Sequence, residues 1–457
     1  MSTSHSEAAR RFNENKEKTT WHDATFWSLR EKRDAMAHTL PEWESLRQHA
    51  SDIKRHTITH LAEYLDKFAS NLERRGVIVH WAKDVGEFNQ TVLDILRSHN
   101  AKTMVKSKSM LTEECGMNPF LMANGIDVVE TDLGERILQL LGQKPSHIVM
   151  PAIHLKREEV GRMFEEKGIS KEIGNYDPTY LTQCARYHLR EEFMEADAGM
   201  TGCNFGVAET GDVVVCTNEG NADMSTSMPK LHIVAMGLEK VIPDYKSLAV
   251  FQRLLCRSAT GQATTAYTSH FRQARPGAEM HVVLVDNGRS DFLANERHWE
   301  TLKCIRCGSC MNTCPVYRRS GGYSYSYFIP GPIGINLGML KDPNKYCGNV
   351  SACTLCLSCD NVCPTKVNPG SQVYWWRQSL DSIGKADKMK KVMSEGMDVL
   401  FNHPALYDTA TGLASLANMI PDEITRYRHL NPWSVGHCKP EFAKETFKAL
   451  WKKGKVK

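Results

Sequence analysis

The chain has 457 residues, of which 41% are hydrophobic and 24% charged, and its formal net charge is +4. These values are ordinary for a globular protein of two or three domains, and the small charge gives no reason to expect nucleic-acid binding. No apolar run is long enough to span a bilayer, and residues 1–18 are too polar for a secretory signal, so we expect a cytoplasmic protein.

The N-terminal part of the chain contains two segments of different character. Residues 1–40 have little apolar periodicity and are expected to form a charged N-terminal arm, extended or partly helical. Between residues 41 and 75 apolar side chains recur at helical spacing, which predicts a long amphipathic helix ended by Gly76. Its histidines lack a complete set of partners at ligand spacing, so we interpret them as solvated or core residues.

From Gly76 onward, short β-rich runs alternate with helical ones, which is the pattern of parallel βαβ units. The composition changes abruptly near residue 290. We therefore expect an α/β domain with a mostly parallel sheet over residues 41–290. The pattern predicts strands at 77–81, 103–106, 126–130, 146–150, 231–236 and 280–285, and helices at 85–98, 133–141, 155–167, 180–195 and 245–257.

The stretch 199–223 is unusually rich in glycine and predicts two short β runs, 206–209 and 212–217, joined by a turn. Glycine lets the backbone approach a ligand closely, so a binding loop is one interpretation and a tightly wound hairpin is the other. No dinucleotide or phosphate-loop motif decides between them. A cofactor-binding loop here would use Gly206, Glu209, Gly211, Asn218, Glu219, Gly220 and Asn221.

Two copies of the pattern C-x2-C-x2-C-x3-C-P follow the α/β domain. This spacing is typical of bacterial ferredoxins, in which three closely spaced thiolates bind one [4Fe–4S] cluster and the fourth ligates the other cluster. It predicts two [4Fe–4S] clusters. The first would be held by Cys304, Cys307, Cys310 and Cys363, and the second by Cys353, Cys356, Cys359 and Cys314.

Other uses of these cysteines fit the spacing less well. All-cysteine zinc sites normally present separated C-x2-C pairs, whereas this chain has triplets with a trailing Cys-Pro. The cysteines outside the motifs are scattered and odd in number, which is typical of a reducing compartment rather than of a disulfide framework. Cys347 lies near the second motif and is a candidate reserve ligand, although the motif is complete without it.

The cysteine motifs define a ferredoxin-type domain with two [4Fe–4S] clusters over residues 291–370. A Gly-, Pro- and aromatic-rich insert separates the motifs and is interpreted either as a wrapping around the clusters or as a docking surface. Residues 371–457 are expected to form a helical C-terminal extension. Its basic end is interpreted as a solvated terminus.

The α/β domain with the sequence AETGDVVVCTNEGN, the paired cysteine motifs, the intervening PGPIG and the helical extension together resemble the lactate utilisation protein B family over nearly the whole chain. The resemblance implies a sugar-isomerase or CoA-transferase type of α/β fold. It also implies the iron–sulfur subunit of a three-component bacterial system that oxidises L-lactate to pyruvate. The implied partners are a cysteine-rich iron–sulfur subunit and a smaller α/β subunit, and any membrane association would be peripheral and run through them.

Three functions follow from these features. Because no motif announces a second redox cofactor, we favour an electron-transfer subunit whose substrate is oxidised on a partner. The alternative is an α/β domain that itself binds a 2-hydroxy acid or acyl substrate, with the clusters as its electron outlet. Its catalytic candidates are Lys230, which would pair with the carboxylate, and His232 or Glu209, which would move protons. An iron–sulfur sensor or scaffold is the third and weakest interpretation.

Overall fold

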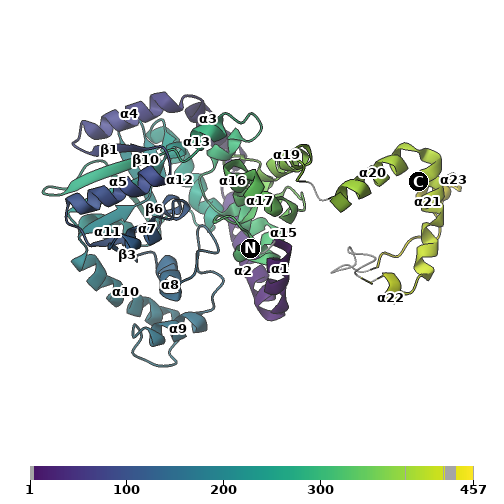
Figure 1. Cartoon of the computed structure of the whole chain (residues 1–457), viewed down its shortest axis with the longest axis horizontal. Coiled ribbons are helices and arrows are strands. Elements are labelled where there is room, and N and C mark those ends of the chain that lie inside the picture. The colour runs from purple at the N-terminus through teal and green to yellow at the C-terminus, as the bar shows by residue number, and fades with distance from the viewer. Residues whose placement is uncertain (1–4, 386–387, 426, 428–438, 456–457) are drawn as a thin grey trace. The chain divides into compact units, whose positions relative to one another are not determined.

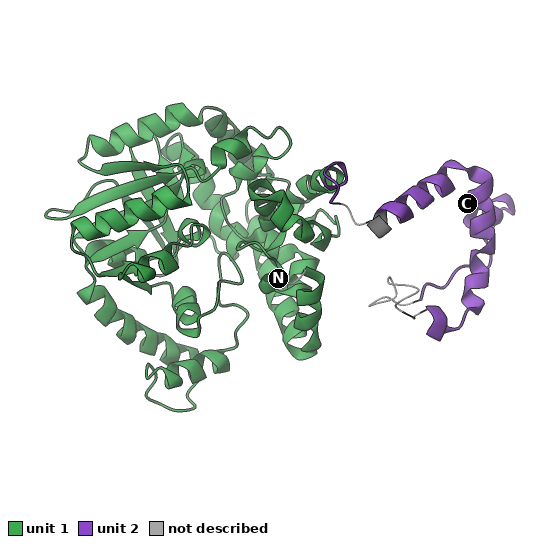
Figure 2. Ribbon diagram, viewed as in Figure 1, with its two compact units in different colours: residues 1–379 green, residues 380–457 purple. Residues whose placement is uncertain are grey.

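The structure is a computed structural model that describes residues 5–385, 388–425, 427 and 439–455. The chain divides into two compact units, residues 1–379 and residues 380–457 (Figure 2). Both cysteine motifs lie in the first unit, together with all the strands of the described residues. The described part of the second unit is built from helices.

A six-stranded sheet forms the centre of the first unit (Figure 1). Its strands follow the order β1-β10-β7-β4-β2-β3, and each neighbouring pair is parallel. This arrangement confirms the expected α/β domain with a mostly parallel sheet. The strands are β1 (Ile78–Ala82), β2 (Thr103–Lys106), β3 (Asp127–Glu130), β4 (Ala198–Thr201), β7 (Leu231–Gly237) and β10 (Glu279–Val285).

Both faces are covered at the centre of this sheet, which is why β7 and β10 are almost entirely buried and rich in apolar residues. On one face, Ile233 of β7 packs in a core with side chains of α5 (Val85–Ser98) and α7 (Met117–Ala123). On the other face, Val234 packs with side chains of α4 (Leu61–Glu73). The alternation of neighbouring residues between two cores fixes the register of β7.

Several of the remaining helices of the α/β domain begin where the sequence provides capping groups. Asp132, Asp177 and Asp244 each accept hydrogen bonds from backbone N–H groups in the first turn of a helix, as expected of N-cap residues. The helices are α6 (Met110–Glu114), α8 (Leu133–Leu141), α9 (Arg157–Glu166), α10 (Pro178–Glu195), α11 (Asn221–Ser227), α12 (Tyr245–Ala259) and α13 (Arg289–Leu293).

A smaller sheet packs beside the central one, in the order β8-β5-β6-β9. Its strands are β5 (Phe205–Val207), β6 (Asp212–Thr217), β8 (Val241–Ile242) and β9 (Tyr267–Phe271). Strands β5 and β6 pair in antiparallel fashion, so the hairpin predicted in the glycine-rich stretch is present. Along β6, Val213 contributes to the core against the central sheet, whereas Val214 contributes to the core with α12.

One strand predicted for this domain is wrong, and three strands of the structure were not predicted. Residues 146–150 do not form a strand, because the N–H and hydroxyl groups of Ser146 both bond to the carbonyl of Pro151 and close a loop. Strand β4 was not expected, since its Ala-Gly-Met-Thr sequence reads as a glycine-rich loop. A Cβ atom at Gly199 would lie 1.6 Å from the carbonyl oxygen of Ser225, so close packing against α11 explains the glycine. Strands β8 and β9 were not predicted either.

The N-terminal segment is helical and packs against the cysteine-rich part of the chain (Figure 1). It forms α1 (His5–Glu14) and α2 (Lys16–His38), followed by α3 (Trp43–Thr59). The single long helix predicted over residues 41–75 is therefore two helices, because His60, with φ −119° and ψ 33°, interrupts the run between α3 and α4. Phe26 of α2 is fully buried, with its ring 5.2 Å from that of Tyr317.

Short helices surround the cysteine motifs. They are α14 (Ser309–Thr313), α15 (Pro315–Ser320), α16 (Gly331–Lys341), α17 (Pro343–Tyr346), α18 (Ser358–Val362) and α19 (Pro369–Ser382). Helix α16 comes from the Gly- and Pro-rich insert. Nine of its residues are buried, so the helix packs deep in the unit.

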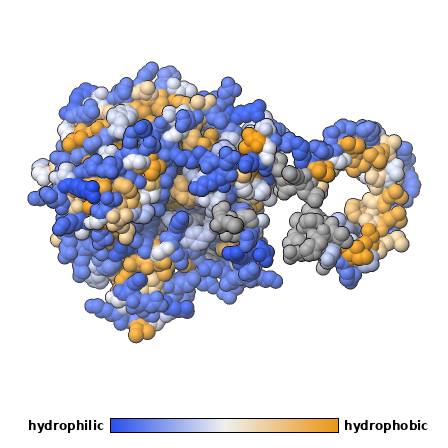
Figure 3. Space-filling view, in the orientation of Figure 1, coloured by the Kyte–Doolittle hydropathy of each residue, from blue (hydrophilic) through white to orange (hydrophobic). Residues whose placement is uncertain are grey.

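The second unit contains α20 (Lys388–Asn402), α21 (Pro404–Leu413), α22 (Asp422–Thr425) and α23 (Phe447–Lys452). Apolar surface is exposed in this unit, as the orange areas of Figure 3 show. The exposed apolar side chains include Phe401, Leu413, Met419 and Trp451. The basic C-terminal end continues beyond α23, and its last two residues lie outside the described part of the chain. No helix in the described ranges is both long and apolar enough to cross a membrane.

Candidate functional site

The two cysteine motifs fold into equivalent loops. Arg306 and Leu355, each two residues after the first cysteine of its motif, have φ values of 61° and 55°. Gly308 and Leu357, each one residue after the second cysteine, have φ values of 78° and 58°. Non-glycine residues rarely adopt this left-handed conformation. Its recurrence at matching positions shows that the sequence repeat is also a backbone repeat.

Backbone N–H groups point at cysteine sulfur atoms at matching positions of both loops. The N–H of Arg306 donates to Cys304 Sγ at 3.4 Å, and the N–H of Leu355 donates to Cys353 Sγ at 3.3 Å. The fourth cysteines also accept such bonds, Cys314 from Tyr317 at 3.5 Å and Cys363 from Val367 at 3.3 Å. Hydrogen bonds of this kind stabilise sulfur that carries negative charge, as metal-bound thiolate does.

The thiols form two groups, each containing one cysteine from the other motif. Burial and then the thiolates of Cys363 and Cys304 raise the pKa of Cys307 to about 12. In the other group, burial and the thiolates of Cys353 and Cys356 raise the pKa of Cys314 to about 11. The fourth cysteine of each motif thus lies among thiols of the opposite motif.

The two thiol groups differ in depth. Cys307 and Cys363 in the first group are buried, whereas Cys356 in the second group is exposed. Leu357, beside Cys356, is 42% exposed. Cys304 and Cys310 of the first group are half-buried and Cys359 of the second is buried, so the second group reaches the surface through Cys356.

Arginine side chains from the N-terminal helices hold the backbone of the second motif. Arg47 of α3 donates from Nε to the carbonyl oxygen of Cys363 at 3.0 Å and from Nη2 to that of Asp360 at 3.2 Å. Arg33 of α2 donates to the carbonyl oxygen of Val362 at 3.2 Å. The N-terminal helices therefore position the loop that carries Cys363.

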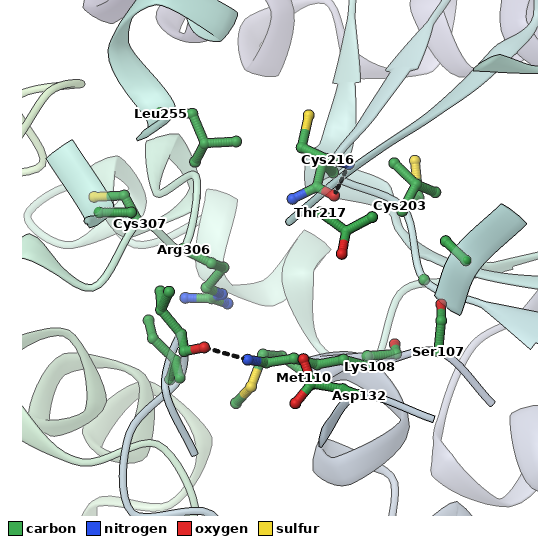
Figure 4. Close-up of a pocket in the computed structure, with 18 of the residues that line it drawn as sticks. Ser107, Lys108, Met110, Asp132, Cys203, Cys216, Thr217, Leu255, Arg306 and Cys307 are labelled. Carbon is green, nitrogen blue, oxygen red and sulfur yellow. Dashed lines mark hydrogen bonds between the residues drawn. The ribbon is translucent and has the colours of Figure 1, made fainter. Parts of the chain in front are cut away.

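A cavity of about 370 Å³ lies between the α/β domain and the first cysteine loop (Figure 4). The carboxyl ends of β2, β4 and β7 open onto it, which is where ligands bind in parallel α/β sheets. The first cysteine loop provides Arg306 and Cys307 to its wall. Figure 4 shows the guanidinium of Arg306 directed into the cavity, with Cys216 and Thr217 on the far side. A ligand here would lie against one of the buried thiols.

The charged groups around this cavity differ in how closely they are paired with opposite charges. Arg289 is held between Glu114, at 3.0 Å from Nη2, and Glu239, and these carboxylates raise its pKa despite burial. Burial alone would raise the pKa of the Glu239 carboxyl. Nearby positive charges, of which Arg289 is the strongest, outweigh burial and lower this pKa to about 2. Arg306 Nη2 lies 3.7 Å from Glu239 Oε1, and burial lowers the pKa of nearby Lys240.

The carboxyl group of Glu219 forms the opposite, acidic side of the cavity. Its Oε2 accepts a hydrogen bond from the N–H of Leu133 at 3.2 Å. Burial and the neighbouring carboxylate of Asp132 raise the pKa of Glu219 to about 7. Lys108, whose Nζ donates to the carbonyl oxygen of Val149 at 2.5 Å, offsets part of this negative charge.

Comparison with known proteins assigns both parts of the first unit. Residues 65–291 match the LUD domain model, and residues 300–367 match the 4Fe-4S dicluster domain model. A lactate utilization protein B from Exiguobacterium is 40% identical over 85% of this chain and 84% of its own length. The chain belongs to the lactate utilization protein B family. Another relative of that name, from Macrococcus caseolyticus, is 44% identical over 74% of this chain and 72% of its own length. An uncharacterized electron transport protein from Escherichia coli is 38% identical over 92% of this chain and 90% of its own length.

The three residues predicted to be catalytic do not lie together in this lactate utilization protein B family member. Glu209 is exposed in the turn between β5 and β6, and Lys230 is exposed just before β7, at the amino end of that strand. His232 is buried, 2.9 Å from the hydroxyl of Thr201, and burial lowers its pKa to about 3. None of these residues belongs to the cavity lining found among the described residues.

The predicted cofactor-binding loop is partly at the cavity. Asn218, Glu219 and Asn221 line it, whereas Gly206, Glu209, Gly211 and Gly220 lie outside its lining within the described chain. The reserve-ligand candidate Cys347 contacts the carbonyl oxygen of Asn344 at 3.7 Å. The role proposed for Cys347 stays a prediction.

Sequence reasoning missed Arg306 and Lys240, although one signal for Arg306 was available. The two motifs read CIRCGSC and CTLCLSC, so an arginine in the first copy stands where the second has leucine. Both residues adopt the same left-handed conformation, but Arg306 extends towards the cavity. A position-by-position comparison of the two motifs would have identified Arg306 as the residue that differs.

Proposed function

We propose that this chain is the iron–sulfur electron-transfer subunit of a multi-subunit system that oxidises L-lactate to pyruvate. Its ferredoxin-type segment would hold two [4Fe–4S] clusters, the first on Cys304, Cys307, Cys310 and Cys363, and the second on Cys353, Cys356, Cys359 and Cys314. The observation that carries the proposal is the sorting of thiols into two groups with exchanged fourth members. The matching N–H bonds to sulfur fit thiolates that bind metal.

When bound, such clusters supply one-electron transfer. The chain's own residues would set the depth of each cluster. Cys307 lines the internal cavity, and Cys356 lies at the surface. The first ligand set therefore faces the cavity and the second faces solvent or a partner, an order suited to moving electrons from the cavity to the surface.

The family name of the relatives supports lactate as the substrate of the whole system. We propose that the partners are a cysteine-rich iron–sulfur subunit and a smaller α/β subunit, and that the LUD domain has a sugar-isomerase or CoA-transferase type of fold. Lactate oxidation would then take place only in the assembled system.

Cluster content and turnover test this function. Anaerobically reconstituted protein should contain iron and sulfide equivalent to two four-iron clusters, and the reduced protein should give an EPR spectrum of [4Fe–4S] centres. Cys363→Ser should lose iron and the signal of the first cluster, whereas the control Cys347→Ser should retain both. Lactate oxidation should require the partner subunits. Turnover by the isolated chain, or full cluster content in Cys363→Ser, would contradict the proposal.

A second candidate function is favoured by the cavity. Because it opens at the carboxyl ends of parallel strands and touches Cys307, the α/β domain itself is suited to hold a small substrate beside the first cluster. The predicted catalytic residues Glu209, Lys230 and His232 would be tested by Glu209→Gln and Lys230→Ala in the reconstituted system. Full activity with both clusters present would reject Glu209 and Lys230 as catalytic groups.

A further inference from the structure

The cavity between the α/β domain and the first cysteine loop contains hydrogen-bond donors that lack acceptors. Arg306 Nη1 is buried without a hydrogen-bond partner. Among the described residues, the ammonium of Lys240 has neither a hydrogen bond nor a carboxylate within salt-bridge distance, and the amide nitrogen of Asn204 has no acceptor. The amide oxygen of Asn204 is used, because it accepts from the N–H of Cys216 at 2.9 Å. Of these three donors, Arg306 Nη1 is the fully buried one. A buried donor without an acceptor is costly, so this arrangement favours an acceptor that enters from outside the chain.

These donors belong to one region of the cavity. Lys240 and Arg306 are electrostatic neighbours, and Lys240 is also a neighbour of Cys203, the residue before Asn204. All these residues line the same cavity. Two cations and an amide donor thus line the same cavity.

The carboxylates close to this region are already engaged by other groups. Glu239 binds Arg289, with Arg306 Nη2 at a longer 3.7 Å, and Glu114 also binds Arg289. On the opposite side of the cavity, Asp132 Oδ1 accepts from the N–H of Glu135 at 3.1 Å as the cap of α8. Glu239 is also an electrostatic neighbour of Lys240, but no described carboxylate lies within salt-bridge distance of the Lys240 ammonium.

A simpler role for these cations is to offset the charge of the first ligand set, since Cys304 is an electrostatic neighbour of both Lys240 and Arg306. That role accounts for two cations near a thiolate. It does not account for the free amide of Asn204, or for a cavity of about 370 Å³, which is within the size range of small-molecule sites.

We propose that this cavity binds a small 2-hydroxy or 2-oxo carboxylate directly beside the first cluster site. Lys240 and Arg306 bind its carboxylate, and the amide of Asn204 donates to the oxygen on the adjacent carbon. Charge-assisted pairing of this kind gives both affinity and orientation. The inference rests on the cluster-binding role proposed above, because it places the ligand against the wall that contains Cys307.

Equilibrium binding to the full-length, anaerobically reconstituted protein tests the inference. Radiolabelled pyruvate and L-lactate are the probes, with acetate and inorganic phosphate as competitors, and iron content and the EPR spectrum are recorded on the same samples. Saturable binding of pyruvate or L-lactate is expected, with weak competition by acetate and phosphate. The ligand should also perturb the EPR signal of the first cluster.

Lys240→Met and Lys246→Met form a matched pair of variants. Lys246 is exposed at the start of α12, outside the cavity lining described above. Lys240→Met should weaken binding at least about tenfold at unchanged iron content, the effect of losing one charge-assisted contact. Lys246→Met should bind as the unchanged protein does.

Several results would overturn the inference. They are absence of saturable binding while both clusters are present, equal displacement by phosphate, and flavin retained in the purified protein but lost from Lys240→Met. A Lys240→Met variant that shifts the cluster reduction potential while binding pyruvate normally would assign Lys240 to the cluster alone. Failure to bind iron would instead refute the proposed electron-transfer function, so the two failures are distinguishable.

Discussion

Glu219 lies in the cavity with its carboxyl group near that of Asp132, and the fold opposes its ionisation. Burial and the Asp132 carboxylate raise its pKa from 4.5 to about 7. Between these two values the unfolded chain loses the proton while the folded chain keeps it. The free energy of unfolding therefore falls as the pH rises through this interval, and the loss is complete above pH 7.

Replacing Glu219 by Gln should remove this penalty and keep the hydrogen bond from Leu133. At pH 8 the variant should be more stable than the unchanged protein by about 1–3 kcal/mol, and at pH 4.5 the two should be nearly equal. Thermal unfolding of both proteins across this pH range is the measurement. A stability difference that does not change with pH would show that Glu219 ionises normally in the folded protein.

At the scale of elements, helix α3 has one face that serves the cysteine loops and one that faces solvent. Arg47 is on the first, where it donates to the carbonyl groups of Cys363 and Asp360. Arg55 is on the second, with a side chain 56% exposed and an ion pair to Glu300 at 3.1 Å. The same residue type in one helix thus occupies two environments.

Arg47→Ala should destabilise the protein by about 2–4 kcal/mol, because buried carbonyl groups lose charged donors. It should also speed the release of iron to a chelator, since the loop that carries Cys363 would loosen. Arg55→Ala is the control and should cost less than about 1 kcal/mol, as exposed ion pairs do. Equal melting temperatures and equal iron release in the two variants would contradict the positioning role of Arg47.

The sequence allowed prediction of those elements whose signals are local. Helices at 85–98 and 133–141 have aspartate caps and apolar periodicity, and both are found with the predicted bounds. Strand β4 escaped because its glycine is required by contact with Ser225, which is distant in sequence. The apolar run 146–150 suggested a strand, but Ser146 accepts a hydrogen bond from Tyr317 and the run packs beside the cysteine segment instead.

For the candidate site, too, only the features with a local sequence pattern could be predicted. The spacing of the cysteines is a local pattern, and it predicts two ligand sets that stay a prediction. The cavity depends on residues from β2, β4, β7 and the first cysteine loop, which only the folded chain brings together. No local pattern marks Lys240, since its place in the cavity depends on segments that are distant in sequence.

At the scale of the whole molecule, the division between residues 379 and 380 separates the cysteine motifs from the C-terminal helices. The described residues of α21, α22 and α23 include none that is buried, so they supply no core of their own. The first unit, by contrast, contains several cores built around its sheets. We expect the first unit to fold and bind iron without the second.

A chain ending after Lys385 keeps all of α19 and tests this expectation. It should retain the iron content, EPR spectrum and melting temperature of the full chain, because the contacts of both thiol groups described above lie before this point. Iron analysis and thermal unfolding of the two forms are the measurements. Loss of iron from the shorter chain would mean that residues beyond 385 support the cluster segment.

The unequal depth of the two thiol groups also bears on how the protein would be damaged in air. Dioxygen and chelators reach exposed ligands first, so attack would begin at Cys356 rather than at Cys307 or Cys363. With clusters bound as proposed, partial damage would spare the inner cluster and remove the outer one. Such a molecule would still look iron-loaded and coloured, yet its remaining cluster would be buried with no outlet to a partner.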